Sequence, residues 1–544
     1  MFGHFPMRKL FYATSVTSVA AVEGISHFFP LARLTYIALL PLIALGIRDV
    51  CQTRHAIMRN FPVIGHLRFL LESVRPEINQ YFVESDIDGT PFDRIKRSNV
   101  YQRAKKELNT TPFGTKKNVY EPGYEWINHS LNPKTPEPGA TRIVVGGPDC
   151  RQPYSASRFN ISAMSYGALS KNAILALNKG AQAGNFAHNT GEGGLSPYHL
   201  QGGGDLIWQI GTGYFSCRNI DGSFSEEAFA QKAVHESIKM IEIKLSQGAK
   251  PGHGGILPKE KITPEIAAIR MVGMDRDVVS PPAHSAFTTP LELVAFIAKL
   301  RHLSGGKPIG FKLCLGNHHE FLAICKAMLE TQIYPDFITL DGGEGGTGAA
   351  PLEFSDSVGT PLNDALIFVH NALVGFNIRD RIRLIVSGKV TTGFDLISKI
   401  AMGADMCNAA RGMMFALGCI QALQCHANTC PTGVATQNPQ LVKGLDVEHK
   451  WKRVKNFHAA TIHSFVELLG AAGFTSPYEL KPQHIQRRIS ATQVKNLGEI
   501  YHYIEPGTLL RNNIPHEFSE ALQAATPESF EPAPVKPVLR LICD

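Results

Sequence analysis

The chain has 544 residues, of which 44% are hydrophobic and 19% charged, and its formal net charge is +7. Such a chain can bury a large core, which predicts one big domain with appendages rather than several small ones. It contains no long Lys/Arg run and no interleaving of basic and aromatic residues, so a nucleic-acid partner is not expected. Its ten cysteines, three of them clustered, suit a reducing compartment better than a disulfide scaffold.

Two apolar runs lie near the N-terminus, at residues 10–22 and 34–47. Each is shorter than the about 20 residues that a transmembrane helix needs, but basic residues flank the outer end of each run. By the positive-inside rule we expect a membrane-anchoring hairpin over residues 1–55, with both ends in the cytoplasm. This predicts an inner-membrane protein whose catalytic domain faces the cytoplasm. The alternatives are a single span over residues 28–47, a cleaved signal peptide and an amphipathic anchor.

Two further segments have no readable function. Residues 56–155 are rich in Pro and Tyr with little periodicity, and their aromatic and turn residues indicate an ordered wrapping segment rather than a linker. Residues 476–544 are expected to form a helical tail with a Pro-rich end.

Between these segments, residues 156–475 alternate short β-rich runs with helical patterns. This alternation predicts a parallel sheet, and eight strands over such a length predict a closed (β/α)8 barrel, the TIM-barrel fold. An open doubly wound sheet is disfavoured, because no G-x-G-x-x-G follows a strand and opens a helix. The expected strands are residues 159–164, 184–188, 206–210, 238–245, 309–315, 336–340, 382–387 and 405–409.

The loops after the seventh and eighth strands carry glycines and cations. They are Ser387-Gly388-Lys389 and Ala410-Arg411-Gly412. In (β/α)8 barrels these loops commonly hold a phosphate, which glycine backbone N–H groups can approach and a cation can neutralise. The strand count therefore predicts a phosphate-bearing cofactor here, with ordinary turn glycines as the alternative.

Charged residues interrupt two of the expected strands. Glu242 and Lys244 alternate with apolar residues on the fourth strand, so both side chains point into the barrel. Lys312 lies inside the apolar fifth strand, where a charge is costly unless it has a purpose. It could stabilise the negative charge of a reduced cofactor and hold a substrate carboxylate, or form a structural ion pair with Glu242.

Three cysteines, Cys419, Cys425 and Cys430, follow the eighth strand with the spacing C-x5-C-x4-C. A zinc site normally has closer pairs and four ligands, so zinc would have to recruit His426 or a distant residue. Buried cysteines without a ligand are another alternative. The cluster among Gly, Asn and Pro residues favours an iron–sulfur centre held by three thiolates, hence 3Fe-4S.

Six segments together resemble the FMN domain of glutamate synthase over roughly residues 155–475: SAMSYGALS, NTGEGG, IEIKLSQGAKPGHGG, SPPAH, GGEGGTGAAP and GCIQALQCHANTCPTGVATQ. The resemblance names the phosphate-bearing cofactor as FMN and implies that the strand-end residues line it together with the two phosphate loops. These strand-end residues are Met164, Ser165, Gln209, Lys244 and Lys312.

The resemblance also implies roles for residues near the substrate. Glu192, in NTGEGG, matches a glutamate that orients the substrate or handles a proton, and Lys312 is the second expected catalytic residue. Two positions depart from the family. Glu344 stands where the family usually has aspartate, and Tyr214 lies in a loop where many members carry arginine.

The implied reaction is reductive amination of 2-oxoglutarate with ammonia to glutamate, using reduced FMN fed by the iron–sulfur cluster. The electron donor is expected to be ferredoxin or a separate NAD(P)H-oxidising subunit, because the chain has no nicotinamide fingerprint. It begins Met1-Phe2, so no N-terminal cysteine and no glutaminase activity are expected. The alternatives are an N-methylglutamate-synthase-like or other amino-acid or oxo-acid flavin enzyme, and a membrane-anchored electron carrier without small-molecule turnover.

Overall fold

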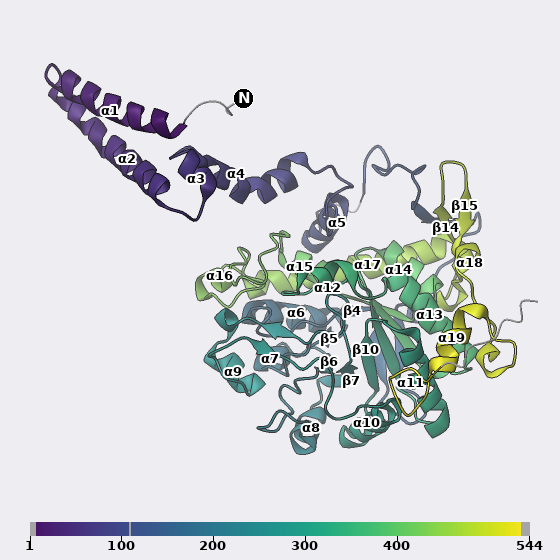
Figure 1. Ribbon diagram of the computed structural model, residues 1–544. Helices are drawn as coiled ribbons and strands as arrows, with labels where there is room; N and C mark the ends of the chain where they lie inside the picture. The colour runs from purple at the N-terminus through teal and green to yellow at the C-terminus, as the bar shows by residue number, and fades with distance from the viewer. Residues whose placement is uncertain (1–6, 108–109, 535–544) are drawn as a thin grey trace, which may run out of the picture. The chain divides into compact units, whose positions relative to one another are not determined.

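The computed structural model describes residues 7–107 and 110–534. The chain divides into two compact units, Met1–Thr90 and Pro91–Asp544. The predicted wrapping segment therefore contributes to both units. Each unit is described by itself below (Figure 1).

The first unit begins with a helical hairpin. Helix α1 (Met7–Ser26) is followed by η1 (Pro30–Thr35) and α2 (Tyr36–Cys51), and the Tyr36 hydroxyl donates to Val19 O at 3.3 Å and to Glu23 at 3.0 Å. The stretch Pro30–Cys51 is, among the described residues, the one helix long and apolar enough to cross a membrane, and it is 6% buried. The hairpin is thus present, and its insertion into a membrane stays a prediction. The unit continues with α3 (Ala56–Asn60), α4 (Gly65–Ile78) and η2 (Asn79–Val83).

The second unit contains a closed barrel of eight parallel strands, as predicted. Each strand pairs with the next, and the last closes on the first through Cys407 opposite Phe159. All eight expected strands are present, with boundaries shifted by a few residues. They are β4 (Phe159–Ile161), β5 (His188–Asn189), β6 (Leu206–Ile210), β7 (Ile238–Lys244), β10 (Ile309–Leu313), β11 (Phe337–Asp341), β12 (Arg383–Ser387) and β13 (Met406–Ala409).

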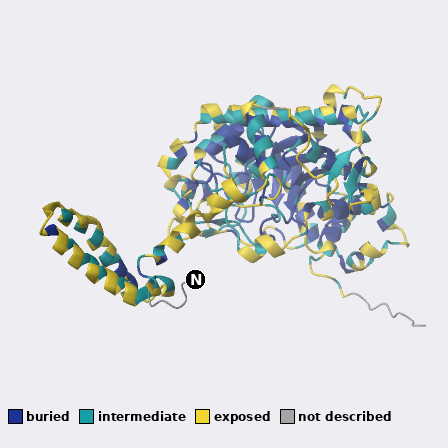
Figure 2. Ribbon diagram, turned by 90° about the horizontal axis from the view of Figure 1, so that it is seen from above, coloured by how far each residue is buried: buried dark blue, intermediate teal, exposed yellow. Residues whose placement is uncertain are grey.

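Helices surround this barrel, and burial is concentrated at the strands (Figures 1 and 2). They begin where the sequence supplies caps: Ser170, for example, accepts from Ala173 N at the start of α6. The longest, α17, lies against α6, where Gly180 leaves room for Val454. The helices between and after the strands are α6 (Lys171–Gly184), α7 (Pro197–Gln201), α8 (Glu226–Ala233), α10 (Pro290–Leu303), α11 (His318–Thr331), α12 (Leu352–Ser357), α13 (Leu362–Gly375), α14 (Gly393–Ala401), α15 (Arg411–Leu417), α16 (Pro439–Lys443) and α17 (Val447–Ala471).

The amino-terminal end of the barrel is closed by a hairpin of β2 (Arg142–Val145) and β3 (Tyr154–Ser157). Its apolar side chains, such as Val145 and Tyr154, form a separate buried cluster with residues at the starts of the strands, such as Met240 and Phe337. The functional site must therefore lie at the opposite, carboxyl-terminal end, where the fold commonly places it.

A long excursion, defined here as residues 246–289, separates β7 from α10. It contains β8 (Ile256–Leu257), η4 (Lys259–Lys261), α9 (Pro264–Arg270) and β9 (Val278–Val279). Because it follows a strand, it lies at the carboxyl-terminal end of the barrel.

The C-terminal tail is not only helical as expected, because β14 (Ile485–Arg488) and β15 (Val494–Asn496) form an antiparallel pair in it. Strand β14 also pairs with β1 (Glu125–Ile127) of the wrapping segment. The sequence of either segment alone did not predict these strands, because each of them is stabilised by hydrogen bonds to the other. Helices α5 (Arg94–Lys105), α18 (Leu497–Ile500) and α19 (His516–Ala524) complete the unit.

Candidate active site

Inside the barrel, the carboxylate of Glu242 is the centre of a buried polar network. It is fully buried and accepts from Gln209 Nε2 at 2.6 Å, from Asn189 Nδ2 at 2.8 Å and from the Thr339 hydroxyl at 2.6 Å. Four strands contribute to this network. The hydrogen bond to Glu242 fixes the orientation of the Gln209 side chain. The alternation predicted for β7 is confirmed, because both Glu242 and Lys244 are buried.

Lys312, on β10, forms its ion pair with Asp341 rather than with Glu242. Its Nζ lies 3.2 Å from Asp341 Oδ2, at the end of the neighbouring strand β11. Burial opposes the charged form, but Asp341 and then Glu242 outweigh it, so the pKa of Lys312 is raised above its ordinary value. Lys312 is therefore a charged ammonium at neutral pH. The sequence pattern found this lysine but missed its partner.

Lys244 pairs with Glu192, which is in the loop after β5. Lys244 Nζ lies 2.7 Å from Glu192 Oε1. Burial raises the pKa of Glu192, but the cations Lys244, Lys250 and Arg270 outweigh it, so the pKa is lowered. Glu192 is thus an ionised carboxylate among three cations.

Two of these cations were not predicted, and both come from the excursion. Lys250 is 1% exposed and donates to Ala349 O at 2.8 Å, and burial lowers its pKa to about 8. Arg270 ends α9, donates to Tyr166 O at 3.1 Å and lies over the Phe215 ring at 5.0 Å. Lys250 stands in the GAKPGHGG segment, but nothing in the sequence marks Arg270.

The loop bearing Glu192 lies against the end of the first strand. A Cβ at Gly191, whose φ is +65°, would come within 2.9 Å of Ser165 N and 3.2 Å of Met164. The buried His199 ring nitrogen Nε2 lies 3.0 Å from Met164 O and fixes the same segment. Met164 and Ser165 are therefore at the barrel end beside Glu192, where the sequence placed them.

The two predicted phosphate loops lie side by side after β12 and β13. Ser387 and Asn408 are register partners, and the Ser387 hydroxyl lies 3.1 Å from the hydroxyl of Ser162. Gly388 and Lys389 follow Ser387, and Arg411 and Gly412 open α15. The loops that the sequence paired are thus brought together.

The cations of these loops form no direct ion pair in the described part of the chain. Within the described residues, neither Lys389 nor Arg411 has a carboxylate within 4 Å, and the Arg411 guanidinium donates to Glu344 O at 3.0 Å. Burial lowers the pKa of Lys389, the charges of Arg411 and of Lys96 on α5 lower it further, and the carboxylates of Glu344 and Asp93 oppose them. Lys96, which pairs with Asp93 at 3.7 Å, is a cation that the sequence did not predict here. Lys389 and Arg411 could both bind an anion directly.

The two departures noted in the sequence have structural roles. Glu344 Oε2 accepts from Leu362 N at 3.0 Å and so holds the start of α13. Tyr214 is fully buried, and its hydroxyl lies 2.9 Å from His284 Nδ1 and accepts from Ala286 N at 3.1 Å. Tyr214 therefore anchors the SPPAH segment rather than facing a substrate.

The three predicted cluster ligands lie in the loop between α15 and α16. Cys430 is buried, and Cys419 and Cys425 are half-buried. Burial raises the pKa of Cys419 to about 12. At Cys430, burial is outweighed by the Thr432 hydroxyl and nearby backbone N–H groups, so its pKa is lowered. Among the residues that the structure describes, no three His, Cys, Asp or Glu side chains lie close enough to hold a single metal ion.

Two residues outside the loop hold it in place. The Tyr101 hydroxyl, on α5, donates to Cys419 O at 2.6 Å. Lys261, on η4, donates to Cys425 O at 2.6 Å, and although burial lowers its pKa, Cys425 and Cys430 oppose this. Both contacts join segments more than a hundred residues apart, so no local pattern could predict them.

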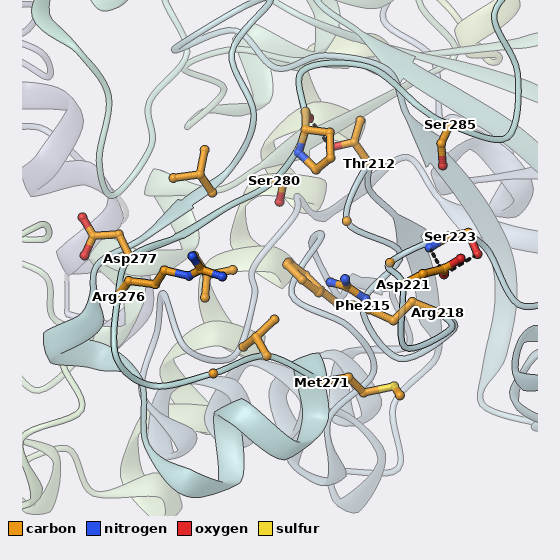
Figure 3. A pocket seen from close by; sticks show the side chains of 17 residues that line it. Thr212, Phe215, Arg218, Asp221, Ser223, Met271, Arg276, Asp277, Ser280 and Ser285 are labelled. Atoms are coloured by element: carbon orange, nitrogen blue, oxygen red, sulfur yellow. Dashed lines mark hydrogen bonds between the residues drawn. The ribbon is translucent and has the colours of Figure 1, made fainter.

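A cavity of ≈ 790 Å³ lies between the loop after β6 and the excursion (Figure 3). Its polar lining includes Thr212, Arg218 and Arg276, and Phe215 and Met271 supply apolar surface. The Thr212 hydroxyl donates to Pro281 O at 2.6 Å and joins the two walls. No predicted FMN-lining residue is part of this lining.

Known proteins resemble the chain over most of its length. A family model for the conserved region in glutamate synthase matches residues 139–475. The glutamate synthase large subunit-like protein YerD of Bacillus subtilis is 38% identical over 497 residues, which cover 84% of this chain and 94% of that protein. The archaeal glutamate synthase (NADPH) of Methanocaldococcus jannaschii is 37% identical over 322 residues, 59% of this chain and 60% of that protein.

Among solved structures, a flavocytochrome b2 mutant with pyruvate bound covers 77% of this chain and 85% of its own, with a TM-score of 0.39 and 13% identity. Because this similarity is so low, it carries no argument, and the family is established by the sequence matches alone. The chain therefore belongs to the glutamate synthase family, a family of oxidoreductases.

Proposed function

We propose that this chain is an FMN- and iron–sulfur-dependent oxidoreductase that forms glutamate from 2-oxoglutarate and ammonia. The observation that carries the proposal is the placement of two cations without a direct ion pair, Lys389 and Arg411, at the same end of the barrel as the buried Lys312–Asp341 pair. A phosphate would bind beside Lys389 and Arg411, and a flavin ring would lie near the Lys312–Asp341 pair.

The residues present fit FMN. Ser387, Gly388, Lys389, Arg411 and Gly412 would hold the phosphate, because the loops after β12 and β13 bring together backbone N–H groups and two cations that form no direct ion pair in the described structure. The strand-end residues Met164, Ser165, Gln209, Lys244 and Lys312 would line the ring. When bound, FMN supplies the hydride for the reduction.

The cysteine loop fits an iron–sulfur centre by its donor chemistry. The hydroxyl and N–H groups around Cys430 favour its thiolate, which is the form that binds iron. Cys419 and Cys425 would complete a three-thiolate set, for which a 3Fe-4S cluster is the proposed occupant. Such a cluster supplies electrons singly.

The chain's own residues then orient the substrate and manage its charge. Ammonia and 2-oxoglutarate lose water to form an imine, which takes up a hydride and a proton to become glutamate. The Lys312 ammonium would hold a substrate carboxylate, while Asp341 keeps that lysine charged. Glu192, an ionised carboxylate held by Lys244, would orient the protonated imine nitrogen by accepting its N–H hydrogen bond.

The proposal includes a separate electron-donor protein and a location at the inner membrane. The M. jannaschii relative is named for NADPH, but a ferredoxin or a separate NAD(P)H-oxidising protein remains the proposed donor for this chain, which has no nicotinamide fingerprint. The apolar stretch Pro30–Cys51 supports anchoring at the inner membrane with the barrel in the cytoplasm.

The test is reoxidation of the reduced flavin under anaerobic conditions. We expect 2-oxoglutarate plus ammonia to reoxidise it much faster than either alone, with glutamate formed in equal amount. One alternative is another amine or oxo acid as substrate, as in N-methylglutamate synthesis. Tyr214, which stands where many family members carry arginine and is buried against His284, favours the other alternative, an electron carrier without small-molecule turnover. Reoxidation by methylamine with 2-oxoglutarate, with N-methylglutamate formed, and not by ammonia with 2-oxoglutarate, would select the N-methylglutamate-type alternative. No reoxidation by any such pair would select the electron-carrier role.

A further inference from the structure

Lys261 is a buried cation beside the cysteine loop. It ends η4 in the excursion after β7, and the residue is 2% exposed. Its Nζ donates to three carbonyl oxygens, those of Cys425 at 2.6 Å, Ala435 at 3.0 Å and Ala168 at 3.2 Å. Three acceptors require three N–H donors, which only the protonated ammonium has. The geometry therefore holds Lys261 in its charged form.

This charge has no carboxylate partner. Among the described residues, no Asp or Glu oxygen lies within 4 Å of Lys261, in contrast to the buried Lys244 and Lys312, which both have one. A buried ammonium without a counter-charge is costly. The nearest proposed cluster ligand is Cys425, whose carbonyl oxygen lies 2.6 Å from Lys261 Nζ. Neutral thiols would leave the charge uncompensated, whereas thiolates bound to iron would compensate it.

We propose that Lys261 is a positioning residue for the iron–sulfur cluster, and that its fixed positive charge raises the cluster's reduction potential. The inference rests on the proposed function, because it requires the cluster to be present. Reduction adds one negative charge to the centre, and a nearby buried cation stabilises the reduced form more than the oxidised form.

Through its three carbonyl acceptors, Lys261 also connects separate segments of the barrel domain. Ala168 belongs to the loop after β4, while Cys425 and Ala435 belong to the cysteine loop. The neighbouring contact, from Asn428 Nδ2 to Glu260 O at 2.9 Å, repeats the same connection. The excursion thus holds the cysteine loop against the strand end that is proposed to line the flavin.

The experiment is potentiometric titration of the full-length holoprotein, monitored by the cluster's electron paramagnetic resonance signal. K261Q removes the charge and keeps N–H donors, K261R keeps the charge, and K259Q is the matched control because Lys259 is exposed on the same turn. We expect K261Q to lower the midpoint potential by at least the equivalent of a tenfold change in the reduced-to-oxidised ratio, about 59 mV for one electron. K261R and K259Q should titrate near the wild type. The shift should persist at high salt, because a buried charge is little screened.

The outcomes separate this inference from the proposed function. A wild-type protein that never forms a cluster signal after anaerobic reconstitution overturns both. A normal wild-type signal with K261Q at the wild-type potential overturns the role of Lys261 alone. If K261Q loses the cluster while K261R retains it, the charge is required for assembly and the inference is supported. If both variants lose it with flavin retained, Lys261 acts by shape, and the inference is wrong.

Discussion

Lys244 Nζ lies 2.7 Å from Glu192 Oε1, and this ion pair joins β7 to the loop after β5 at the carboxyl-terminal end of the barrel. The Glu192 side chain is 18% exposed and that of Lys244 is 8% exposed. Removing one partner of such a pair leaves a buried charge without compensation, which costs more than the pair itself is worth.

Glu192→Gln should therefore destabilise the protein, by roughly 3 kcal/mol, the lower end of the range for a broken buried pair. The pKa of Glu192 is lowered in the folded state, so this stabilisation is present above the ordinary glutamate pKa of about 4.3 and is lost as the pH falls through the lowered value. Urea unfolding at pH 7 and near pH 3.5 measures it. Glu448→Gln, which breaks the exposed pair with Lys179, should change stability little. An equal effect of the two substitutions would contradict the prediction.

Lys312→Met should lower kcat/KM by about 10²–10³-fold, the usual loss when a group that stabilises developing charge is removed. The substitution also leaves Asp341 uncompensated, so stability should fall. The double variant K312M/D341N separates the two effects, since it removes both charges of the pair. We expect the double variant to recover thermal stability and not activity. Recovery of activity in the double variant would show that Lys312 is only structural.

Lys389→Met should weaken FMN binding. A charge-assisted hydrogen bond contributes about 1.5–3 kcal/mol, so the dissociation constant should rise about 10- to 100-fold. Equilibrium dialysis of the flavin measures this. Lys455→Met, on the exposed face of α17, carries the same charge change and should leave the affinity unaltered. If Lys389→Met binds FMN as tightly as the wild type, the phosphate does not bind in the loop after β12.

Cys425→Ser should abolish the iron–sulfur signal and leave FMN bound, because a serine hydroxyl is a poor substitute for a thiolate ligand. The control is Cys51→Ser, since Cys51 is an exposed thiol of the other unit. Iron and sulfide content, together with the visible spectrum, gives the readout. A variant that retains its full iron content would exclude Cys425 as a ligand.

Deletion of residues 1–55 should release the protein from membranes without changing its flavin content. The reason is that Pro30–Cys51 is apolar and 6% buried within the protein, so it has a large apolar surface to cover. The measurement is the distribution between pellet and supernatant after ultracentrifugation without detergent. Full-length protein that stays in the supernatant would refute the anchor.

The barrel was predictable from the sequence because each strand and helix carries a local pattern, and the predicted phosphate loops follow from the strand count. Lys312 was equally visible, because a lysine in an apolar strand is conspicuous. Its partner Asp341 was not, since the register between β10 and β11 had to be known first. Lys96, Lys261 and Arg270 were missed for the same reason. Each lies on a segment whose local sequence does not show that it packs against the site.

The pairing of β1 with β14 has a consequence for the synthesis of the chain. Trp126 is opposite Gln486, and at about 5–20 residues per second a ribosome needs roughly 20–70 s to pass from the first to the second. During that interval the edge of β1 has no β14 to pair with, and unpaired strand edges promote association between chains. A nascent chain of this protein should therefore expose the β1 edge to other chains until β14, which lies within the last 60 residues, has been made.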